Sequence, residues 1–289
     1  MRFLQMILEK GSVMSSLTPS TAHLPKLLVL DLDGTLLNAQ HCLGDLTKQT
    51  LQQVAAHGVE IMIATGRHFQ DVYLLAKQLQ IPVSLITSNG ARIHNPSGEL
   101  LYENHIPAPL VSEVLRLSQG YSVHRNIYQG DVWLVEEENE PLLEIHHASG
   151  FAYAMTDFDQ LDPDHIDKFY FNAPHETLLP LYDRLQQELG EQLYITFTTE
   201  IYLEVMNKSV SKGTALAQIC QQRGIDAAEV MAFGDGCNDI EMLQWVGQPV
   251  VMQNARPELH QAVPEAARAL SNIDEGVAQY LQANFLGSL

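Results

Sequence analysis

Two aspartates stand one residue apart directly after an apolar run near the start of the chain. The run "LLVL" at 27–30 is followed by "DLDGTLL" at 31–37. Asp-Gly is favourable turn chemistry, which accounts for Asp33 and Gly34 but not for Asp31. Asp31 would end a buried strand, where an unpaired charge is costly. The pair therefore indicates a site that uses two carboxylates.

Other polar residues stand at the ends of further predicted core elements. Thr65 and Gly66 end a strand expected at 59–66, and Lys212 starts a helix. Asp235 lies at the end of a strand expected at 229–236, and Asn238 and Asp239 follow it. Ligands of open α/β sheets bind at the carboxyl ends of the strands, so we expect these side chains to meet Asp31 and Asp33. A cation in the first turn of a helix is electrostatically unfavourable, so Lys212 makes sense beside an anion.

These residue types suit phosphoryl transfer. Clustered carboxylates require a hard cation, and carboxylates plus a substrate phosphate are typical ligands of Mg²⁺. Zinc would require His or Cys, and neither type is grouped at these positions. One carboxylate can attack phosphorus while a second acts as general acid and base. The Thr65 hydroxyl, the Gly66 N–H and the Lys212 ammonium would hold the phosphoryl oxygens. The set predicts phosphoryl transfer to water.

Composition limits the class of protein and of partner. The 289 residues are 46% hydrophobic and 18% charged, which indicates a globular chain of one or two domains. The net charge of −19 would repel phosphate backbones, so no nucleic acid partner is expected. No apolar run approaches the roughly 20 residues of a membrane-spanning helix, so no membrane partner is expected. Cys42, Cys220 and Cys237 share no close spacing, which favours the cytoplasm.

The elements that position these residues alternate between strand and helix. We expect strands at 27–31, 59–66 and 83–90, helices at 45–58 and 68–80, and a hairpin at 91–106. After Ser211 we expect strands at 229–236 and 248–252, and helices at 212–224, 238–246, 257–263 and 274–285. This alternation predicts an α/β fold with a parallel sheet wrapped by helices.

An inserted segment interrupts this alternation. "PAP" at 107–109 has the composition of a linker, and short strands mixed with two helical stretches at 140–149 and 176–189 follow it. That mixture predicts an inserted α+β cap. The expected organisation is a loose leader at 1–25, a core at 26–107 and 206–289, and a cap at 108–205.

Four short motifs connect the chain to a family. "DLDGTLL", "ATGR", the Lys of "VSKG" and "GDGCND" resemble, in this order, the motifs of the haloacid dehalogenase-like (HAD) phosphatases. The insert resembles the larger C2-type cap of the Cof-type subfamily, as do "ITSNGARI" and "LEVMNKSVSKG". The resemblance runs from Lys26 to the end of the chain. It implies a Rossmann-like parallel-sheet core with an inserted α+β cap.

The resemblance also implies an activity and a role for each motif residue. It implies Mg²⁺-dependent hydrolysis of a small phosphorylated metabolite, a sugar phosphate or pyridoxal 5′-phosphate, through an aspartyl phosphate. Asp31 would be the nucleophile and a metal ligand, and Asp33 would be the general acid and base with its carbonyl on the metal. Asp235 would bind the metal directly. Phosphate contacts would come from Leu32 N–H, Thr65, Gly66, Lys212 and Asn238, with Asp239 supporting the site.

Alternatives from other classes remain open. A receiver-type phospho-acceptor domain also uses clustered Asp, Thr and Lys with magnesium, but it is shorter and has no inserted cap. A non-catalytic binding protein on this fold would not need Asp33 as an acid and base. A phosphotransferase that moves phosphate between sugars would use the same residues. The oligomeric state is left open.

Residues around the cleft carry further expectations. Arg67, Asn89 and Arg92 follow strand ends that face the cleft, so we expect them to contact the leaving group. Cys237 is expected to be a small buried filler. The aromatic residues Tyr128, Trp133 and Phe171 are expected in the packing of the cap strands.

Overall fold

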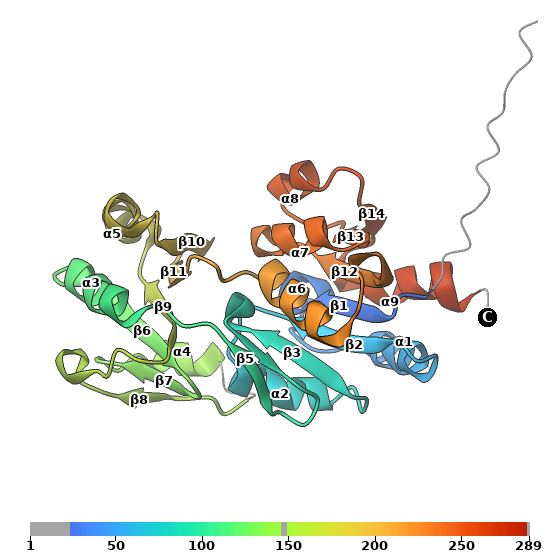
Figure 1. Cartoon of the computed structure of the whole chain (residues 1–289), viewed down its shortest axis with the longest axis horizontal. Coiled ribbons are helices and arrows are strands. Elements are labelled where there is room, and N and C mark those ends of the chain that lie inside the picture. Colours follow the sequence, from blue (N-terminus) through green and yellow to red (C-terminus); the bar gives the residue numbers. More distant parts are fainter. Residues whose placement is uncertain (1–23, 146–148, 288–289) are drawn as a thin grey trace, which may run out of the picture.

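The computed structural model describes residues 24–145 and 149–287, and it contains two sheets (Figure 1). The expected leader at 1–25 lies almost wholly outside the described residues. One sheet has eight strands and belongs to the core, and the other has six strands and belongs to the cap. The two units lie side by side, with the cap strands in green and yellow in Figure 1.

The core sheet is parallel over most of its width. In spatial order its strands are β14 (Ala267–Ala269), β13 (Gln248–Met252), β12 (Val230–Gly234), β1 (Leu27–Asp31), β2 (Glu60–Ala64), β3 (Val83–Thr87), β4 (Arg92–His94) and β5 (Leu100–Glu103). Strands β14 to β3 pair in parallel, whereas β4 and β5 form an antiparallel hairpin at the edge. The predicted hairpin at 91–106 is thus confirmed. Strand β1 is central and buried along its whole length, because helices cover both faces.

Two apolar layers hold the core helices against the sheet. One layer packs α1 (Asp45–Ala56), α2 (Phe69–Lys77) and α9 (Gly276–Leu281) on one face. The other packs α6 (Lys212–Arg223), α7 (Ile240–Trp245) and α8 (Pro257–Ala262) on the opposite face. The result is a three-layer α/β/α core, as the alternation of elements predicts.

The cap is built on a second sheet with helices on one face. In spatial order its strands are β10 (Leu193–Thr199), β11 (Tyr202–Asn207), β9 (Ile166–Asn172), β6 (His124–Gln129), β7 (Val132–Val135) and β8 (Tyr153–Met155). Helices α3 (Ala108–Ser118) and α5 (His175–Leu189) cover one face through a shared apolar cluster. The short helix α4 (Glu140–Ile145) follows β7.

Side chains of the cap strands alternate between the two faces of this sheet. In β9, Phe169 and Phe171 belong to the cluster under α3 and α5. Lys168 and Tyr170 point to the other face and line a cavity between cap and core. This two-residue period is what strand geometry imposes on every second side chain.

The chain crosses between core and cap at two adjacent points. Asn104 Nδ2 donates to Ser209 Oγ at 2.9 Å, and Asn207 Nδ2 donates to the His105 carbonyl at 2.7 Å. Ile106 N donates to the carbonyl of Ile166 at 2.8 Å. The outgoing and returning segments are therefore tied to each other by side-chain hydrogen bonds.

Several elements differ from the expectations. The segment read as a linker at 107–109 begins helix α3, with Pro109 in its first turn, where the missing N–H of proline is harmless. Apolar Val111, Val114 and Leu117 give this helix its buried stripe. Strand β11 continues the cap sheet to Asn207, past the expected boundary at 205. The three-residue strands β8 and β14 were not expected, because neither is long enough to show a period.

None of the described helices combines the length and the apolar character needed to cross a membrane.

Candidate active site

Three neighbouring strands deliver the motif residues to one edge of the core sheet. Asp31 is the last residue of β1 and pairs with Ala64 of β2. Thr65 therefore follows directly beside it, and Asp235 follows β12 on the other side. Asp31 and Thr65 are buried, at 6% and 1% exposure. The carboxyl ends of β2, β1 and β12 thus bring together side chains that are far apart in sequence.

A glycine lets the loop after β1 approach the loop after β12. Gly34 has a φ of +82°, and a Cβ at this position would lie 2.3 Å from Asp235 Oδ2. Only glycine meets both requirements without strain. The next residue then reaches the same carboxylate, since Thr35 Oγ1 donates to Asp235 Oδ1 at 2.8 Å. The turn "DGT" therefore carries Asp33 and also holds the side chain of Asp235 in position.

Lys212 lies between two carboxylates at the base of the site. Its Nζ donates to Asp31 Oδ1 and to Asp239 Oδ1, both at 2.6 Å, and its side chain is fully buried. Burial alone would lower the pKa of Lys212, but the charges of Asp239 and Asp31 raise it above its ordinary value. The first turn of α6 is tolerable for this cation because two anions face it.

Helix α6 begins with a capping box that fixes Lys212. The Ser211 hydroxyl accepts from Thr214 N at 3.1 Å, and the Thr214 hydroxyl accepts from Ser211 N at 3.0 Å. Both orphan donors at this helix start are satisfied. The same turn therefore sets the backbone from which Lys212 extends.

Three carboxylates cluster in a way that fits a hard divalent cation. Oxygens of Asp31, Asp235 and Asp239 all lie within 4.8 Å of one another. Burial and the neighbouring charge of Asp239 raise the pKa of Asp31 well above its usual range, against the opposing effect of Lys212. Burial and Asp239 likewise raise the pKa of Asp235. One ammonium does not balance three carboxylates, and an oxygen-only donor set of this kind suits Mg²⁺.

Asp239 has both oxygens engaged by the protein. Oδ1 accepts from Lys212, and Oδ2 accepts from Asp235 N at 3.0 Å and from Gly236 N at 2.9 Å. This arrangement gives Asp239 a supporting position, since its contacts orient both Lys212 and the loop that carries Asp235.

Asp33 extends outward from the cluster and pairs with an arginine. Arg67 Nε and Nη2 donate to the two Asp33 oxygens at 2.7 and 2.5 Å. Arg67 Nη1 also lies 3.4 Å from Asp71 Oδ2, and Asp71 Oδ1 accepts from the Ser149 hydroxyl of the cap at 2.6 Å. A chain of contacts thus joins Asp33 to the cap. The sequence pattern did not predict this pairing.

A second polar chain crosses from core to cap through Asn89. Asn238 Nδ2 donates to Asn89 Oδ1 at 3.0 Å, and Asn89 Nδ2 donates to Glu204 Oε2 at 2.8 Å. Lys168 Nζ then donates to Glu204 Oε1 at 2.8 Å and to the Gly66 carbonyl at 3.1 Å. This network places cap strands β9 and β11 directly over the motif residues.

Backbone geometry after β3 aims Asn89 into this network. Ser88 and Asn89 have φ values of +49° and +57°, in the left-handed region that non-glycine residues seldom adopt. Consecutive strained residues of this kind cluster at functional sites. The strand expected to run to residue 90 therefore stops at Thr87, and the turn after it carries Asn89.

The motif residues surround a cavity of about 470 Å³ between core and cap. Eight of the predicted catalytic, phosphate, metal and substrate residues line it: Asp31, Asp33, Thr65, Gly66, Arg67, Asn89, Asp235 and Asn238. Leu32, Lys212 and Asp239 do not line it, and all three are fully buried beneath it. The sequence thus predicted most of the core wall of the cavity.

Arg92 lies elsewhere. It belongs to β4, is 4% exposed, and its Nη1 donates to the Gly130 carbonyl and to Asp131 Oδ1 of the cap at 2.5 and 2.6 Å. It does not line the cavity, because the β4 hairpin turns its side chain toward the β6–β7 turn. The expectation that Arg92 faces the leaving group is wrong, and its contacts connect core and cap instead.

The cap side of the cavity is mostly aromatic and was largely missed from the sequence. Its lining residues include Tyr128, Lys168, Tyr170, Tyr194, Phe197, Tyr202 and Glu204. In cap strands such as "DKFYFNA", alternate side chains point to opposite faces of the sheet, and this two-residue period could have predicted them. Tyr128 lines the cavity rather than only packing, which corrects the expectation, whereas Trp133 and Phe171 are buried as expected. Cys237 is half-buried and lines the cavity, so it is not a buried filler.

Comparison with known proteins agrees with this geometry. The model of the haloacid dehalogenase-like hydrolase family matches residues 28–281. An HMP-PP phosphatase from Cronobacter sakazakii is 36% identical over 256 residues, covering 89% of this chain and 94% of that protein. The crystal structure of a haloacid dehalogenase-like hydrolase from Bacteroides thetaiotaomicron is 26% identical, with a TM-score of 0.81, covering 90% of this chain and 100% of that one.

A more distant solved structure shares the fold. The subclass IIB sugar phosphatase BT4131 is 23% identical, with a TM-score of 0.76, and the match covers 89% of this chain and 98% of that one. The family match spans nearly all of the core and cap, and the motif residues meet at one edge of the sheet. The chain therefore belongs to the haloacid dehalogenase-like hydrolase family, as a phosphatase of the Cof type.

Proposed function

We propose that this protein is a Mg²⁺-dependent phosphatase that hydrolyses a small phosphorylated metabolite through an aspartyl phosphate on Asp31. The observation that carries the proposal is the position of Asp31. Its carboxylate lines the cavity, while Lys212 engages Oδ1 at 2.6 Å from beneath. The remaining oxygen is the nucleophile, and the Lys212 ammonium favours the ionised form of Asp31 by opposing the rise in its pKa that burial causes.

Asp33 acts in both halves of the proposed reaction. As the Asp31 oxygen bonds to phosphorus, the bond to the leaving oxygen breaks and Asp33 supplies its proton. Asp33 then takes a proton from the water that attacks the aspartyl phosphate, which releases inorganic phosphate, restores the Asp31 carboxylate and leaves Asp33 protonated for the next cycle. For these steps Asp33 leaves its pairing with Arg67, whose guanidinium is then available to the substrate. Thr65, Gly66 and Asn238 hold the phosphoryl oxygens.

Asp31 and Asp235, with the carbonyl of Asp33, are the proposed ligands of the magnesium ion. The fit rests on the cluster of oxygen donors and its excess negative charge. When bound, the ion supplies electrostatic stabilisation of the phosphoryl oxygens. Asp239 stays with Lys212 and the loop N–H groups and holds the ligand loop in place.

The aromatic cap wall favours a substrate whose alcohol carries a flat ring. Tyr128, Tyr170 and Tyr202 line the cavity beside Lys168 and Glu204. Rings stack on flat heterocycles, and the charged pair offers a donor and an acceptor to ring substituents. Of the two substrate classes implied by the sequence, this wall favours pyridoxal 5′-phosphate over sugar phosphates. The match to an HMP-PP phosphatase makes HMP-PP the third compound to test.

The first test is the nucleophile and its metal. With Mg²⁺, the protein should release phosphate from p-nitrophenyl phosphate, and Asp31→Asn should abolish the release. A matched control is Asp45→Asn, because Asp45 is an exposed aspartate at the start of α1. Turnover of Asp31→Asn near that of the control would refute the nucleophile, and wild-type activity that persists in EDTA would refute the metal.

The second test is a substrate panel. Phosphate release is compared for pyridoxal 5′-phosphate, HMP-PP and several sugar phosphates at equal concentration. We expect the highest kcat/KM for a ring-bearing substrate and a loss of at least tenfold in Tyr170→Ala. A higher kcat/KM for a sugar phosphate than for both ring compounds would refute the preference inferred from the aromatic cap wall. A sugar acceptor that outcompetes water would indicate a phosphotransferase instead.

We propose the cytoplasm as the compartment. Cys42, Cys220 and Cys237 are all unpaired, as a reducing environment requires.

A further inference from the structure

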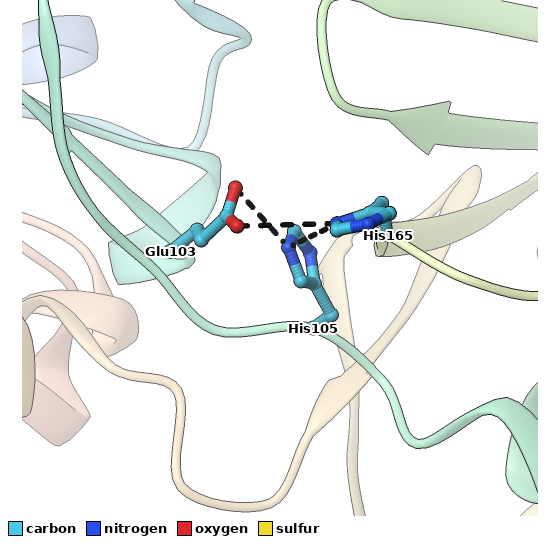
Figure 2. A group of neighbouring side chains, drawn as sticks. All are labelled: Glu103, His105 and His165. Atoms are coloured by element: carbon cyan, nitrogen blue, oxygen red, sulfur yellow. Dashed lines mark hydrogen bonds and ion pairs between the residues drawn. The ribbon is translucent and has the colours of Figure 1, made fainter.

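A second group of metal-ligating side chains lies where the chain passes from core to cap. Glu103 ends β5, His105 belongs to the crossing segment, and His165 stands in the turn before β9. Figure 2 shows the three side chains directed toward one another from these separate segments. In the part of the chain that the structure describes, this cluster and the active-site carboxylates are the two groups of such ligands.

The distances within this cluster match those of a metal site. His105 Nε2 lies 3.2 Å from Glu103 Oε2 and 3.2 Å from His165 Nδ1. His165 Nδ1 lies 3.9 Å from Glu103 Oε1. A tetrahedral ion with ligand bonds of about 2.1 Å holds neighbouring donor atoms about 3.4 Å apart. The observed spacings lie on both sides of that value, so an ion fits with small side-chain movements.

A buried carboxylate orients the central histidine. Asp167 Oδ1 lies 2.9 Å from His105 Nδ1, and Asp167 is completely buried. This contact places a proton on Nδ1, and in the neutral ring it leaves the lone pair of Nε2 directed at Glu103 and His165. A carboxylate behind the ring is the usual partner of a metal-binding histidine. Among the described residues, Asp167 Oδ2 has no hydrogen-bond partner, and it lies 3.9 Å from Arg92 Nε.

The cluster is also accessible to an ion from solvent. The side chains of His165 and Glu103 are 68% and 39% exposed. His165 has a φ of +61°, and its ring is directed toward His105 of the crossing segment (Figure 2). Two imidazoles and one carboxylate form a donor set that zinc uses with a fourth position left for water.

We propose that Glu103, His105 and His165 bind a divalent transition-metal ion of the zinc class, separate from the carboxylate site. The two sites would differ in chemistry: imidazole nitrogen selects zinc-like ions, whereas the oxygen donors of the active site select Mg²⁺. The ion would join the end of core strand β5 to the turn that leads into cap strand β9. It would therefore fasten the junction of the two units from outside the active site.

One competing arrangement uses no metal. The Asp167 hydrogen bond raises the pKa of His105, and a doubly protonated His105 could donate to both Asp167 and Glu103. The same residues would then form an ion-pair network. The two arrangements differ in whether the folded protein takes up one equivalent of metal through His165, because the network requires no ion.

Cobalt is the probe that separates the two sites. Full-length protein is titrated with Co²⁺ in a large excess of Mg²⁺, and visible absorption is recorded. A four-coordinate Co²⁺ with nitrogen ligands absorbs visible light far more strongly than a six-coordinate Co²⁺ with oxygen ligands. We expect one equivalent of intense absorption in the wild type and in Asp31→Asn, and its loss in His165→Asn. Asparagine tolerates the positive φ at this position, so this variant should fold.

His57→Asn is the matched control, since His57 is an exposed histidine after α1. It should keep the full absorption. As a second readout, Zn²⁺ in the presence of Mg²⁺ should raise the Tm of the wild type and of His57→Asn but not that of His165→Asn. Wild-type protein without the absorption would overturn the proposal. So would absorption that survives in His165→Asn or that disappears in Asp31→Asn.

Discussion

At the scale of single residues, Lys212 shows how the site balances its charges. It is fully buried and holds Asp31 and Asp239 with one ammonium. Removing it would leave two carboxylates facing each other without a cation. Breaking a buried ion pair in this way typically costs about 3–5 kcal/mol, because the remaining charge is desolvated and unpaired.

The corresponding prediction concerns Lys212→Met. We expect the free energy of unfolding, measured by urea denaturation in EDTA at pH 7, to fall by about 3–5 kcal/mol. Phosphatase activity should also be lost. Lys208→Met is the control, since Lys208 is exposed and should change the free energy by no more than about 0.5 kcal/mol. Equal effects of the two substitutions would show that Lys212 does not carry the buried charge balance.

His68 makes stability depend on pH. Its ring is fully buried, stacks on Phe151, and makes hydrogen bonds that suit the neutral form: Nδ1 accepts from Gln70 N, and Nε2 contacts the Gly130 carbonyl. Burial lowers its pKa from 6.5 to about 4. The unfolded chain therefore takes up a proton at higher pH than the folded protein, and stability falls as pH drops from 6.5 toward 4.

The prediction is a difference between two pH values. From pH 7 to pH 5 this group should remove about 2 kcal/mol of the unfolding free energy. His68→Asn keeps an acceptor at the start of α2 but does not titrate, so its loss over the same interval should be smaller by that amount. Urea unfolding at both pH values checks this. Identical losses in wild type and variant would contradict the assignment.

At the scale of elements, the sequence predicted which residues lie at the ends of the core strands. It did not predict which residues of the cap strands face the cavity. Asp31, Thr65 and Asp235 could be placed because each ends an apolar run, and parallel strands end at one edge. The cavity positions of Tyr170 and Glu204 were not predicted, because the composition of the cap strands indicates core packing by default, although their two-residue period assigns alternate side chains to the cavity. Arg92 was misplaced because antiparallel β4 points it toward the cap.

Two further contacts join residues that are far apart in the sequence, and one helix begins with an unusual composition. Arg67 and Asp33 lie 34 positions apart, and no local pattern predicts their ion pair. His105 and His165 lie 60 positions apart, so histidine grouping could not be recognised from spacing. Helix α3 was missed because two prolines at its start resemble a linker, although proline is common in a first helical turn.

The capping box of α6 gives a prediction at this scale. Ser211→Ala removes the hydroxyl that accepts from Thr214 N, and we expect a loss of about 1 kcal/mol in urea unfolding. Because Lys212 is the next residue, kcat should also fall several-fold. Ser211→Thr keeps a capping hydroxyl and should retain most of both properties. A destabilised Ser211→Ala with unchanged kcat would show that the cap does not position Lys212.

At the scale of the whole molecule, charge opposes the substrate. The protein carries a net charge of −19, while phosphorylated metabolites are anions. Three cationic side chains line the cavity: Arg67, Lys168 and Arg256. They attract the anionic substrate only at short range. Added salt screens the long-range repulsion more than the short-range contacts.

We therefore expect kcat/KM for a phosphomonoester to rise as KCl is increased from low to physiological ionic strength, at constant free Mg²⁺. The effect should lie in KM rather than in kcat, because screening acts on encounter. Steady-state kinetics across a salt series tests this. A fall in kcat/KM over the same range would mean that the local cations dominate the field.

The paired crossing points between the two sheets have a consequence for how such proteins diversify. Asn104 holds Ser209 and Asn207 holds His105, so the outgoing and returning strands stand next to each other. A segment whose two ends are adjacent can be exchanged as a cassette without stretching the host chain. The residues proposed to attack phosphorus and to transfer the proton, Asp31 and Asp33, both belong to the host. New leaving-group preferences can therefore be acquired by replacing one block of sequence, while the chemistry of bond breaking is left untouched.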